Sequence, residues 1–142
     1  MNDPGLKAPG ASHGQRYSPL VVRHFEQPHH AGTLSGDYET ALHGRGGQRE
    51  QGTEVVFHIG VDADLMAEIT FQAFGCPHTI AACSELTVRL TGRPVEALDE
   101  VRPDELAACL DLPVEKTGRL LIIEDALRKC LTAWDNRWLG EK

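Results

Sequence analysis

Two apolar segments separated by three residues constrain the fold more than any other feature of this sequence. In residues 53–61 and again in residues 65–74, apolar side chains recur at every second position, which is the period of a strand with one buried face. The connection, residues 62–64, is too short for anything but an antiparallel hairpin. His58, on the other face of its strand, is expected to be half exposed. The buried face is predicted to hold Val55, Phe57, Ile59, Val61, Leu65, Ala67, Ile69, Phe71 and Ala73.

A thiol stands where the second strand gives way to a helix. Gly75 supplies a sharp turn, and Pro77 suits the first helical position, where a missing N–H costs nothing. Cys76 is therefore predicted at the capping position, facing unpaired N–H groups and the positive end of the helix dipole. That setting lowers a thiol pKa and favours the thiolate, which binds metal or accepts sulfur. The alternative is a small buried residue in a tight turn, and position alone does not separate the two.

The second half of the chain is predicted to be helical. A helix follows Pro77 and ends at Gly92-Arg93-Pro94, and shorter helices are expected at residues 94–98 and 103–110. The last helix is expected from about residue 119 to residue 138. Its apolar stripe consists of Leu120, Ile123, Leu127, Cys130, Leu131, Trp134 and Trp138. Cys83, Cys109 and Cys130 all fall on such helical stripes and are predicted to be packed in the core.

The first half carries weaker signals. Residues 1–16 are rich in Gly, Pro, Ala and Ser and are expected to form a flexible tail before a single domain at 17–142. Ser18 and Pro19 predict the start of a helix that stops before Pro28. Residues 28–32 are expected to form a turn with solvated histidines. A weak strand is expected at residues 38–43, and the glycine-rich residues 44–47 are predicted to form a flexible loop.

Composition narrows the function classes. The chain has 142 residues, a formal net charge of −7 and four cysteines without a paired C-x-x-C. The negative charge argues against nucleic acid as a partner, and no apolar run has the length of a membrane span. A reducing cytoplasm is the expected location. Strands followed by helices predict an α+β fold, a small antiparallel sheet with helices packed on one face. No phosphate loop, nucleophile elbow or local hydrolytic triad is present, so no enzyme is predicted.

Four stretches resemble the IscU-like, NifU N-terminal scaffold proteins, which build iron–sulfur clusters. Residues 17–32 match the pattern Y-x-x-x-V-x-x-H-[FY]-x-x-P-x-x-x-G, and residues 75–84 resemble the central G-C-x-x-x-I-A-x-x-S segment. Leu112-Pro113 and residues 124–127 resemble the approach to, and body of, the last helix in that family. The resemblance covers nearly the whole chain after residue 16. It implies the α+β fold already expected and a role in iron–sulfur cluster assembly.

The resemblance also implies an altered ligand set. The family holds its cluster with three cysteines, an aspartate near the first and often a histidine beside the third. At the first site Gln51 stands at the cysteine position and Thr53 at the aspartate position. At the third site Gly118 stands at the histidine position and Arg119 at the cysteine position. Cys76 alone is retained, and one thiolate beside an arginine does not hold a two-iron cluster in the family's manner.

Three functional hypotheses follow. In the first, Cys76 carries sulfur or shares a cluster between two protomers, with a cysteine desulfurase or other cluster-assembly proteins as partners. In the second, the chain is a non-catalytic interaction or regulatory protein of that machinery that has lost cluster binding. In the third, Cys76 and His78 or other nearby histidines hold a single iron or zinc ion, although zinc normally takes three or four protein ligands. Residues 112–116 match only part of the L-P-P-V-K stretch that specialised chaperones recognise in some members.

Overall fold

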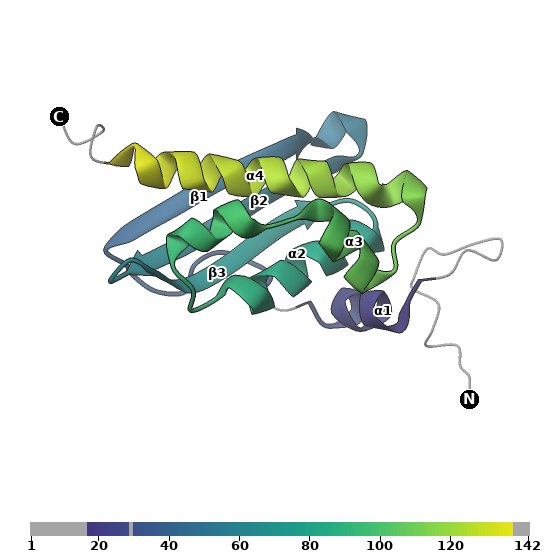
Figure 1. The fold of residues 1–142 in the computed structure, drawn as a ribbon, viewed down its shortest axis with the longest axis horizontal. Coiled ribbons are helices and arrows are strands. Elements are labelled where there is room, and N and C mark those ends of the chain that lie inside the picture. The colour runs from purple at the N-terminus through teal and green to yellow at the C-terminus, as the bar shows by residue number, and fades with distance from the viewer. Residues whose placement is uncertain (1–16, 29, 138–142) are drawn as a thin grey trace.

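The computed structural model describes residues 17–28 and 30–137 (Figure 1). The predicted tail at 1–16, His29 and Trp138 lie outside this part of the chain. Three short 3-10 turns, η2 (Arg49–Gln51), η3 (Val95–Glu100) and η4 (Val114–Lys116), connect the longer elements. The strands are β1 (Thr40–Gln48), β2 (Thr53–Asp62) and β3 (Leu65–Phe74). The helices are α1 (Pro19–Glu26), α2 (Pro77–Leu90), α3 (Pro103–Leu110) and α4 (Thr117–Asp135).

The three strands form one antiparallel sheet in the order β1-β2-β3. Figure 1 shows the helices gathered on one face of this sheet. Helix α4 packs over β1 and β2, α2 packs over β3, and α1 packs against α2. This arrangement confirms the predicted α+β class with helices on a single face.

The predicted hairpin is confirmed, with one change of face. Val55, Phe57, Ile59 and Val61 are buried as expected, but an irregularity between Gly60 and Val61 shifts the pairing with β3. A bulge moves the side chains before it to the other face of the strand. The prediction was therefore wrong for Leu65 and Ala67, which are exposed, and Met66 is buried in their place.

The loop predicted at residues 44–47 is wrong, because these residues belong to strand β1. Their glycines permit a close approach of helix α4. A Cβ atom at Gly44 would collide with the carbonyl oxygen of Ala126, and one at Gly46 with that of Ile122. Glycine inside a strand commonly marks such a backbone contact. These glycines therefore fix how close α4 lies to β1.

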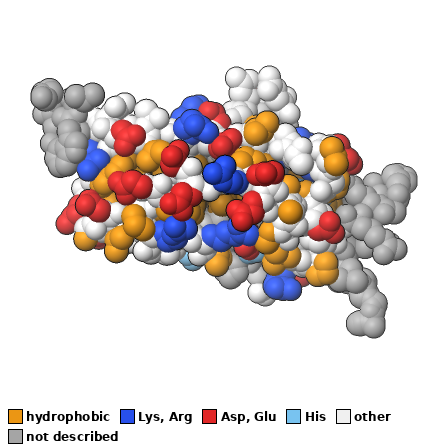
Figure 2. Space-filling view, in the orientation of Figure 1, with side chains coloured by type: hydrophobic (Ala, Val, Ile, Leu, Met, Phe, Trp, Pro, Cys, Tyr) orange, Lys and Arg blue, Asp and Glu red, His pale blue; other side chains and the backbone are white. Residues whose placement is uncertain are grey.

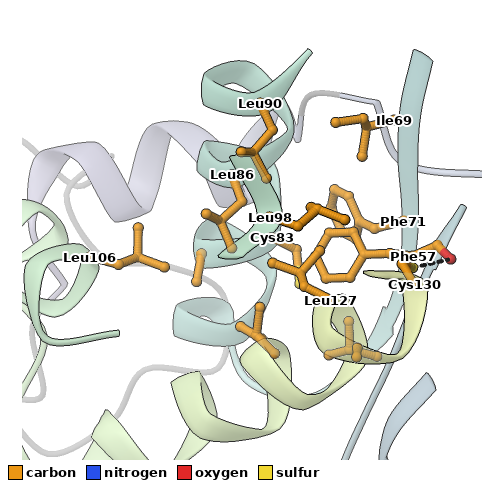
Figure 3. Close-up of a cluster of buried hydrophobic side chains, with 14 of the residues drawn as sticks. Phe57, Ile69, Phe71, Cys83, Leu86, Leu90, Leu98, Leu106, Leu127 and Cys130 are labelled. Atoms are coloured by element: carbon orange, nitrogen blue, oxygen red, sulfur yellow. Dashed lines mark hydrogen bonds between the residues drawn. The ribbon is translucent and has the colours of Figure 1, made fainter. Parts of the chain in front are cut away.

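One apolar core lies between the sheet and the helices (Figure 3). Cys83 and Cys130 are fully buried in it, and Cys130 Sγ lies 3.9 Å from the Phe57 carbonyl oxygen. Cys109 is exposed, so its predicted burial was wrong. On α3 only Leu106 and Leu110 are buried, and Cys109 is turned about 100° from Leu110 around the helix. The inward stripe of this short helix is too narrow to include it.

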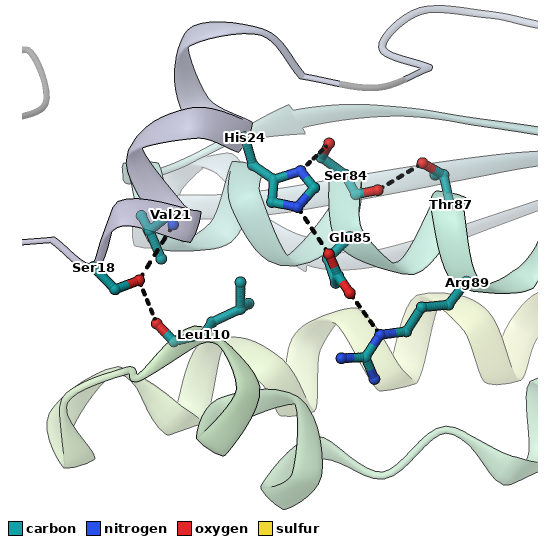
Figure 4. Close-up of polar contacts among 8 residues, drawn as sticks. All are labelled: Ser18, Val21, His24, Ser84, Glu85, Thr87, Arg89 and Leu110. Carbon is teal, nitrogen blue, oxygen red and sulfur yellow. Dashed lines mark hydrogen bonds and ion pairs between the residues drawn. The ribbon is translucent and has the colours of Figure 1, made fainter. Parts of the chain in front are cut away.

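The start of α1 is anchored to the end of α3. Ser18 caps α1 as predicted, because its Oγ accepts a hydrogen bond from the Val21 N–H at 3.2 Å. The same hydroxyl donates to the Leu110 carbonyl oxygen at 2.7 Å (Figure 4). The helix ends at Glu26, before Pro28, as the proline rule requires.

A polar network joins α1 to α2 (Figure 4). The two ring nitrogens of His24 lie 2.7 Å from Ser84 Oγ and 2.8 Å from Glu85 Oε1. Arg89 Nε donates to the other Glu85 oxygen at 2.7 Å. Partial burial raises the pKa of Glu85, but Arg89 and His24 outweigh it and hold that pKa below its ordinary value. The carboxylate therefore stays charged and fastens the two helices together.

Acidic and basic side chains alternate across the helical face of the molecule (Figure 2). Several are paired along a helix, such as Arg128 with Glu124 at 3.1 Å and Lys129 with Asp125 at 3.4 Å. Exposed pairs of this kind contribute little to stability. Within residues 17–28 and 30–137, no helix combines the length and apolar character needed to cross a membrane.

Candidate functional site

Five elements meet at one end of the sheet. There β1 ends, β2 begins, β3 ends, and α2 and α4 begin (Figure 1). Residue pairing fixes this convergence, because Gln48 pairs with Thr53, and Glu54 pairs with Phe74. One residue further along the same register, Thr53 comes level with Gly75. The sheet thus brings the start of β2 to the turn that carries the predicted thiol.

Cys76 occupies the N-cap of α2, as predicted. Its backbone is extended (φ −81°, ψ 169°), and Pro77 is the first helical residue. The Cys76 carbonyl oxygen accepts from the Thr79 N–H at 3.0 Å, which closes the first turn of the helix. The side chain is neither fully buried nor fully exposed. A half-buried thiol at a helix start is shielded from bulk water but can still be reached by a partner.

The surroundings of Cys76 favour its thiolate. Burial raises the pKa of the thiol, but hydrogen bonds from His78, from the backbone and hydroxyl of Thr79 and from Arg119 outweigh burial and lower the pKa from 9.0 to about 5. The Thr79 hydroxyl oxygen lies 3.6 Å from Sγ. The thiol is therefore ionised at neutral pH.

Arg119 reaches Cys76 from the first turn of α4. Its side chain lowers the pKa of the Cys76 thiol, although the two residues are far apart in the sequence. Arg119 Nε is buried and has no hydrogen-bond partner in the described part of the chain, and the same holds for Nδ1 of His78. Both residues lower the pKa of the thiol, so the site retains polar atoms that a bound group can satisfy.

The other positions singled out from the sequence lie near this end of the sheet but differ in burial. Gln51 is exposed in turn η2, just before Gly52, whose positive φ of 93° suits glycine. Thr53 is buried, with 3% of its surface exposed. Gly118 is exposed in the first turn of α4, where an added Cβ would meet no atom within 4 Å. Of these positions and Arg119, only Arg119 contributes to the lowered pKa of Cys76.

Two neighbours of the thiol were missed in the sequence. Tyr17 lies with its ring centroid 4.6 Å from that of His78. Burial, followed by the charge of Cys76, raises the pKa of Tyr17, so its hydroxyl stays protonated. Thr79 could have been found from its spacing, because a residue three positions after an N-cap faces the capping side chain. No local pattern connects Tyr17 to Cys76, because the two residues lie on different segments that only the tertiary structure brings together.

The remaining cysteines differ from Cys76 in their surroundings. Burial raises the pKa of Cys83, and it raises the pKa of Cys130 to about 12, so both thiols stay protonated. In residues 17–28 and 30–137, no group of three or more His, Cys, Asp or Glu side chains is placed to hold one metal ion. The described site thus offers a reactive thiolate without a ready set of metal ligands.

The comparison with known families gives a single clear result. Residues 16–139 match the model of the NifU-like N terminal domain. The chain belongs to this family. Among its relatives, the iron–sulfur cluster assembly scaffold protein IscU of Rickettsia prowazekii is 30% identical over 127 residues, covering 89% of this chain and 97% of that protein. The IscU scaffold protein of Escherichia coli is 25% identical and covers 85% of this chain and 95% of its own length.

Solved structures support the NifU-like fold. A proposed iron–sulfur cluster assembly scaffold protein for the SUF system of Fervidobacterium islandicum superposes with a TM-score of 0.62 at 14% identity, covering 81% of this chain and 96% of its own. A nitrogen-fixing NifU-like protein (N-terminal) of Brucella abortus gives a TM-score of 0.61 at 11% identity, covering 81% and 91%. At such identities the likeness concerns the fold, with its one-sided helical layer over three strands.

Proposed function

We propose that this NifU-like protein acts in iron–sulfur cluster assembly as a sulfur carrier, with Cys76 as the acceptor. The observation that carries the proposal is the half-buried Cys76 at the start of α2, whose thiol pKa is lowered to about 5. Family membership and the names of the IscU relatives supply the pathway. The site itself supplies the chemistry, because a thiolate is the form of cysteine that attacks a sulfur atom.

The ligand set does not fit a cluster held by one protomer. By resemblance to the family, Gln51, Cys76 and Arg119 occupy the three cysteine positions, so a single thiolate remains. A two-iron cluster takes four ligands, usually thiolates. The positive charge of Arg119 opposes a bound cation and favours an anion. A cluster is therefore cargo that this chain would hold only with thiols from another protein or a second protomer.

Sulfur transfer to Cys76 needs no external oxidant. The Cys76 thiolate attacks the outer sulfur of a donor persulfide, and a new bond forms between Sγ and that sulfur. The sulfur–sulfur bond of the donor breaks, and the donor leaves as a thiolate with the bonding electron pair. The product, a persulfide on Cys76, is again an anion when its proton is lost, and Arg119 is placed to pair with it. A cysteine desulfurase is the class of partner that presents such a persulfide.

Persulfide transfer can be measured by intact mass. After anaerobic incubation with a cysteine desulfurase and cysteine, the wild-type chain is expected to gain the mass of one sulfur atom, and peptide mapping should place it on Cys76. Cys76→Ser should gain none, whereas Cys109→Ser, the matched control at the exposed thiol, should behave as the wild type. Sulfur found on Cys109 and absent from Cys76 would refute the proposal. The chain would then fit better as an interaction protein of the machinery.

The altered ligand set makes a second prediction. Monomeric wild-type protein, reconstituted with iron and sulfide, should retain no two-iron cluster, whereas the variant Gln51→Cys, Thr53→Asp, Arg119→Cys should bind iron and sulfide and absorb visible light. Thr53 is buried, and an unpaired carboxylate there is costly, so the double variant Gln51→Cys, Arg119→Cys is the second arm. If wild-type monomer binds a full cluster, the assignment of these positions is wrong. It is also wrong if both variants fold and stay colourless.

A further inference from the structure

Two histidines face each other on the side of the sheet that carries no helix. His43 of β1 and His58 of β2 are direct cross-strand partners. Their Nδ1 atoms lie 2.8 Å apart, and the rings are nearly perpendicular, with centroids 5.1 Å apart and an interplanar angle of 71°. His43 is exposed and His58 is half exposed. Both side chains therefore border solvent on this face of the sheet.

The proton positions on the two histidines follow from a third side chain, Gln72, which is hydrogen-bonded to His58. His58 Nε2 lies 2.8 Å from Gln72 Oε1 on β3. An amide oxygen only accepts, so Nε2 carries the hydrogen, and the Nδ1 of neutral His58 presents a lone pair. His43 then donates its Nδ1–H to that lone pair. One proton thus lies between two nitrogens that are both capable of binding a metal.

We propose that His43 and His58 form a binding site for a divalent metal ion that prefers square or tetragonal geometry, copper(II) or nickel(II). At metal–nitrogen bonds of about 2.0 Å, two nitrogens 2.8 Å apart subtend an angle of about 90° at the metal, which is the angle between neighbouring ligands in that geometry. A tetrahedral ion such as zinc would need the nitrogens about 3.3 Å apart. The ion lies to one side of the line between the two nitrogens and displaces the Nδ1 hydrogen of His43, whose ring then carries its hydrogen on Nε2.

The neighbouring side chains support this assignment. Gln72 fixes the tautomer and orientation of His58, which is the role of the outer partner of a metal-binding histidine. Arg45, two residues after His43, pairs with Glu54 at 2.9 Å, so its charge is partly neutralised. The remaining coordination positions open to water or to a second molecule. This site is formed by the middle of the strands, apart from Cys76 at the sheet end, and it does not depend on the proposed sulfur transfer.

Nickel(II) is the probe, because it does not oxidise thiols as copper(II) does. The experiment uses untagged protein that carries Cys76→Ser and Cys109→Ser, because these substitutions remove the accessible thiols that would compete for the metal. Titration calorimetry near neutral pH should then show one nickel ion bound per chain. Both His43→Gln and His58→Gln should weaken binding at least tenfold. Gln72→Leu should weaken it about tenfold, as losses of outer partners do. His13→Gln, a histidine outside the described residues, is the matched control and should bind as the parent does.

A spectroscopic readout separates ligation from an indirect effect. Copper(II) bound to the same thiol-free protein should show electron-spin coupling to two nitrogens, and His43→Gln or His58→Gln should reduce that number. Circular dichroism confirms that each variant folds. Unchanged nickel affinity in both histidine variants would overturn the proposal, and tighter binding of zinc than of nickel would overturn the assigned geometry.

Discussion

Replacing Arg119 by glutamine should raise the pKa of Cys76, and the effect can be read from the pH dependence of alkylation. In the wild type this pKa is about 5, because hydrogen bonds from His78, Thr79 and Arg119 outweigh the effect of burial. Removing one cationic partner should raise it by about 1, the lower end of the range for a neighbouring charge. Arg119→Lys keeps the positive charge, so the Cys76 pKa in this variant should lie between the values in the wild type and in Arg119→Gln.

A lowered thiol pKa is better detected by measuring the alkylation rate over a range of pH than by one rate at pH 7. At pH 7 a thiol of pKa 5 is about 99% ionised and one of pKa 9 about 1%. The more acidic thiolate is, however, intrinsically about 40 to 100 times less nucleophilic over that difference. The two effects nearly cancel at pH 7. At pH 5 the advantage of Cys76 over an ordinary thiol should be about 50-fold or more, so the midpoint of the profile is the diagnostic quantity.

The assay uses Cys109→Ser protein, which leaves Cys76 as the only thiol that is not buried. Iodoacetamide alkylation is followed by mass from pH 4 to pH 9, and the rate constant should reach half its plateau near pH 5. Ultraviolet thiolate absorbance gives an independent midpoint. A wild-type midpoint near 9 would refute the electrostatic account of the site. If the midpoint lies near pH 5 and is the same in Arg119→Gln, Arg119 does not contribute to the lowered pKa of Cys76.

Three further predictions concern the fold. Gly46→Ala should destabilise the protein by about 1–3 kcal/mol in urea unfolding, because the new Cβ meets the backbone of α4, whereas Gly118→Ala, with open space around it, should be neutral or slightly stabilising. Glu85→Gln should cost about 1–3 kcal/mol at pH 7. Folding lowers the pKa of Glu85, so the stability that this carboxylate contributes is fully present above its ordinary pKa of 4.5. That stability is lost as the pH falls through the pKa that Glu85 has in the folded protein. The variant should therefore lose less stability than the wild type between pH 6 and pH 3. Trp134→Ala should cost about 3–5 kcal/mol, since only 5% of this side chain is exposed, and a loss below about 0.5 kcal/mol would place Trp134 outside the core.

Much of the fold was predictable because its strongest signals are local. The alternation in residues 53–74 predicted the hairpin, and Gly75-Cys76-Pro77 predicted the start of α2. The strand character of Gly44 and Gly46 was hidden. Glycine has no strand propensity. Glycine is required at these positions because helix α4, about eighty positions later in the sequence, lies against them. A close contact between distant backbones leaves no periodic pattern in either segment.

In the candidate site, too, features set by neighbouring residues were predictable and contacts between distant segments were not. The N-cap position of Cys76 and the effect of His78 and Thr79 on its ionisation come from residues next to it in the sequence, and these were accessible to sequence reasoning. The placement of Arg119 beside the sulfur rested on the family resemblance, and the effect of Arg119 on the Cys76 pKa agrees with it. The pairing of His43 with His58 needed the register between β1 and β2. That register was out of reach while residues 44–47 were predicted to be a loop.

The charge at Cys76 decides which cargo the site favours. In a site with three thiolates and a carboxylate, the negative charges together attract iron, and each added cation reduces their repulsion. Here one thiolate faces one guanidinium, so the pair is close to neutral before anything binds. An arriving cation gains little from this pair and must displace Arg119. A persulfide keeps the same single charge after transfer, so Arg119 can remain in place throughout, which is the physical reason that we propose sulfur as the cargo.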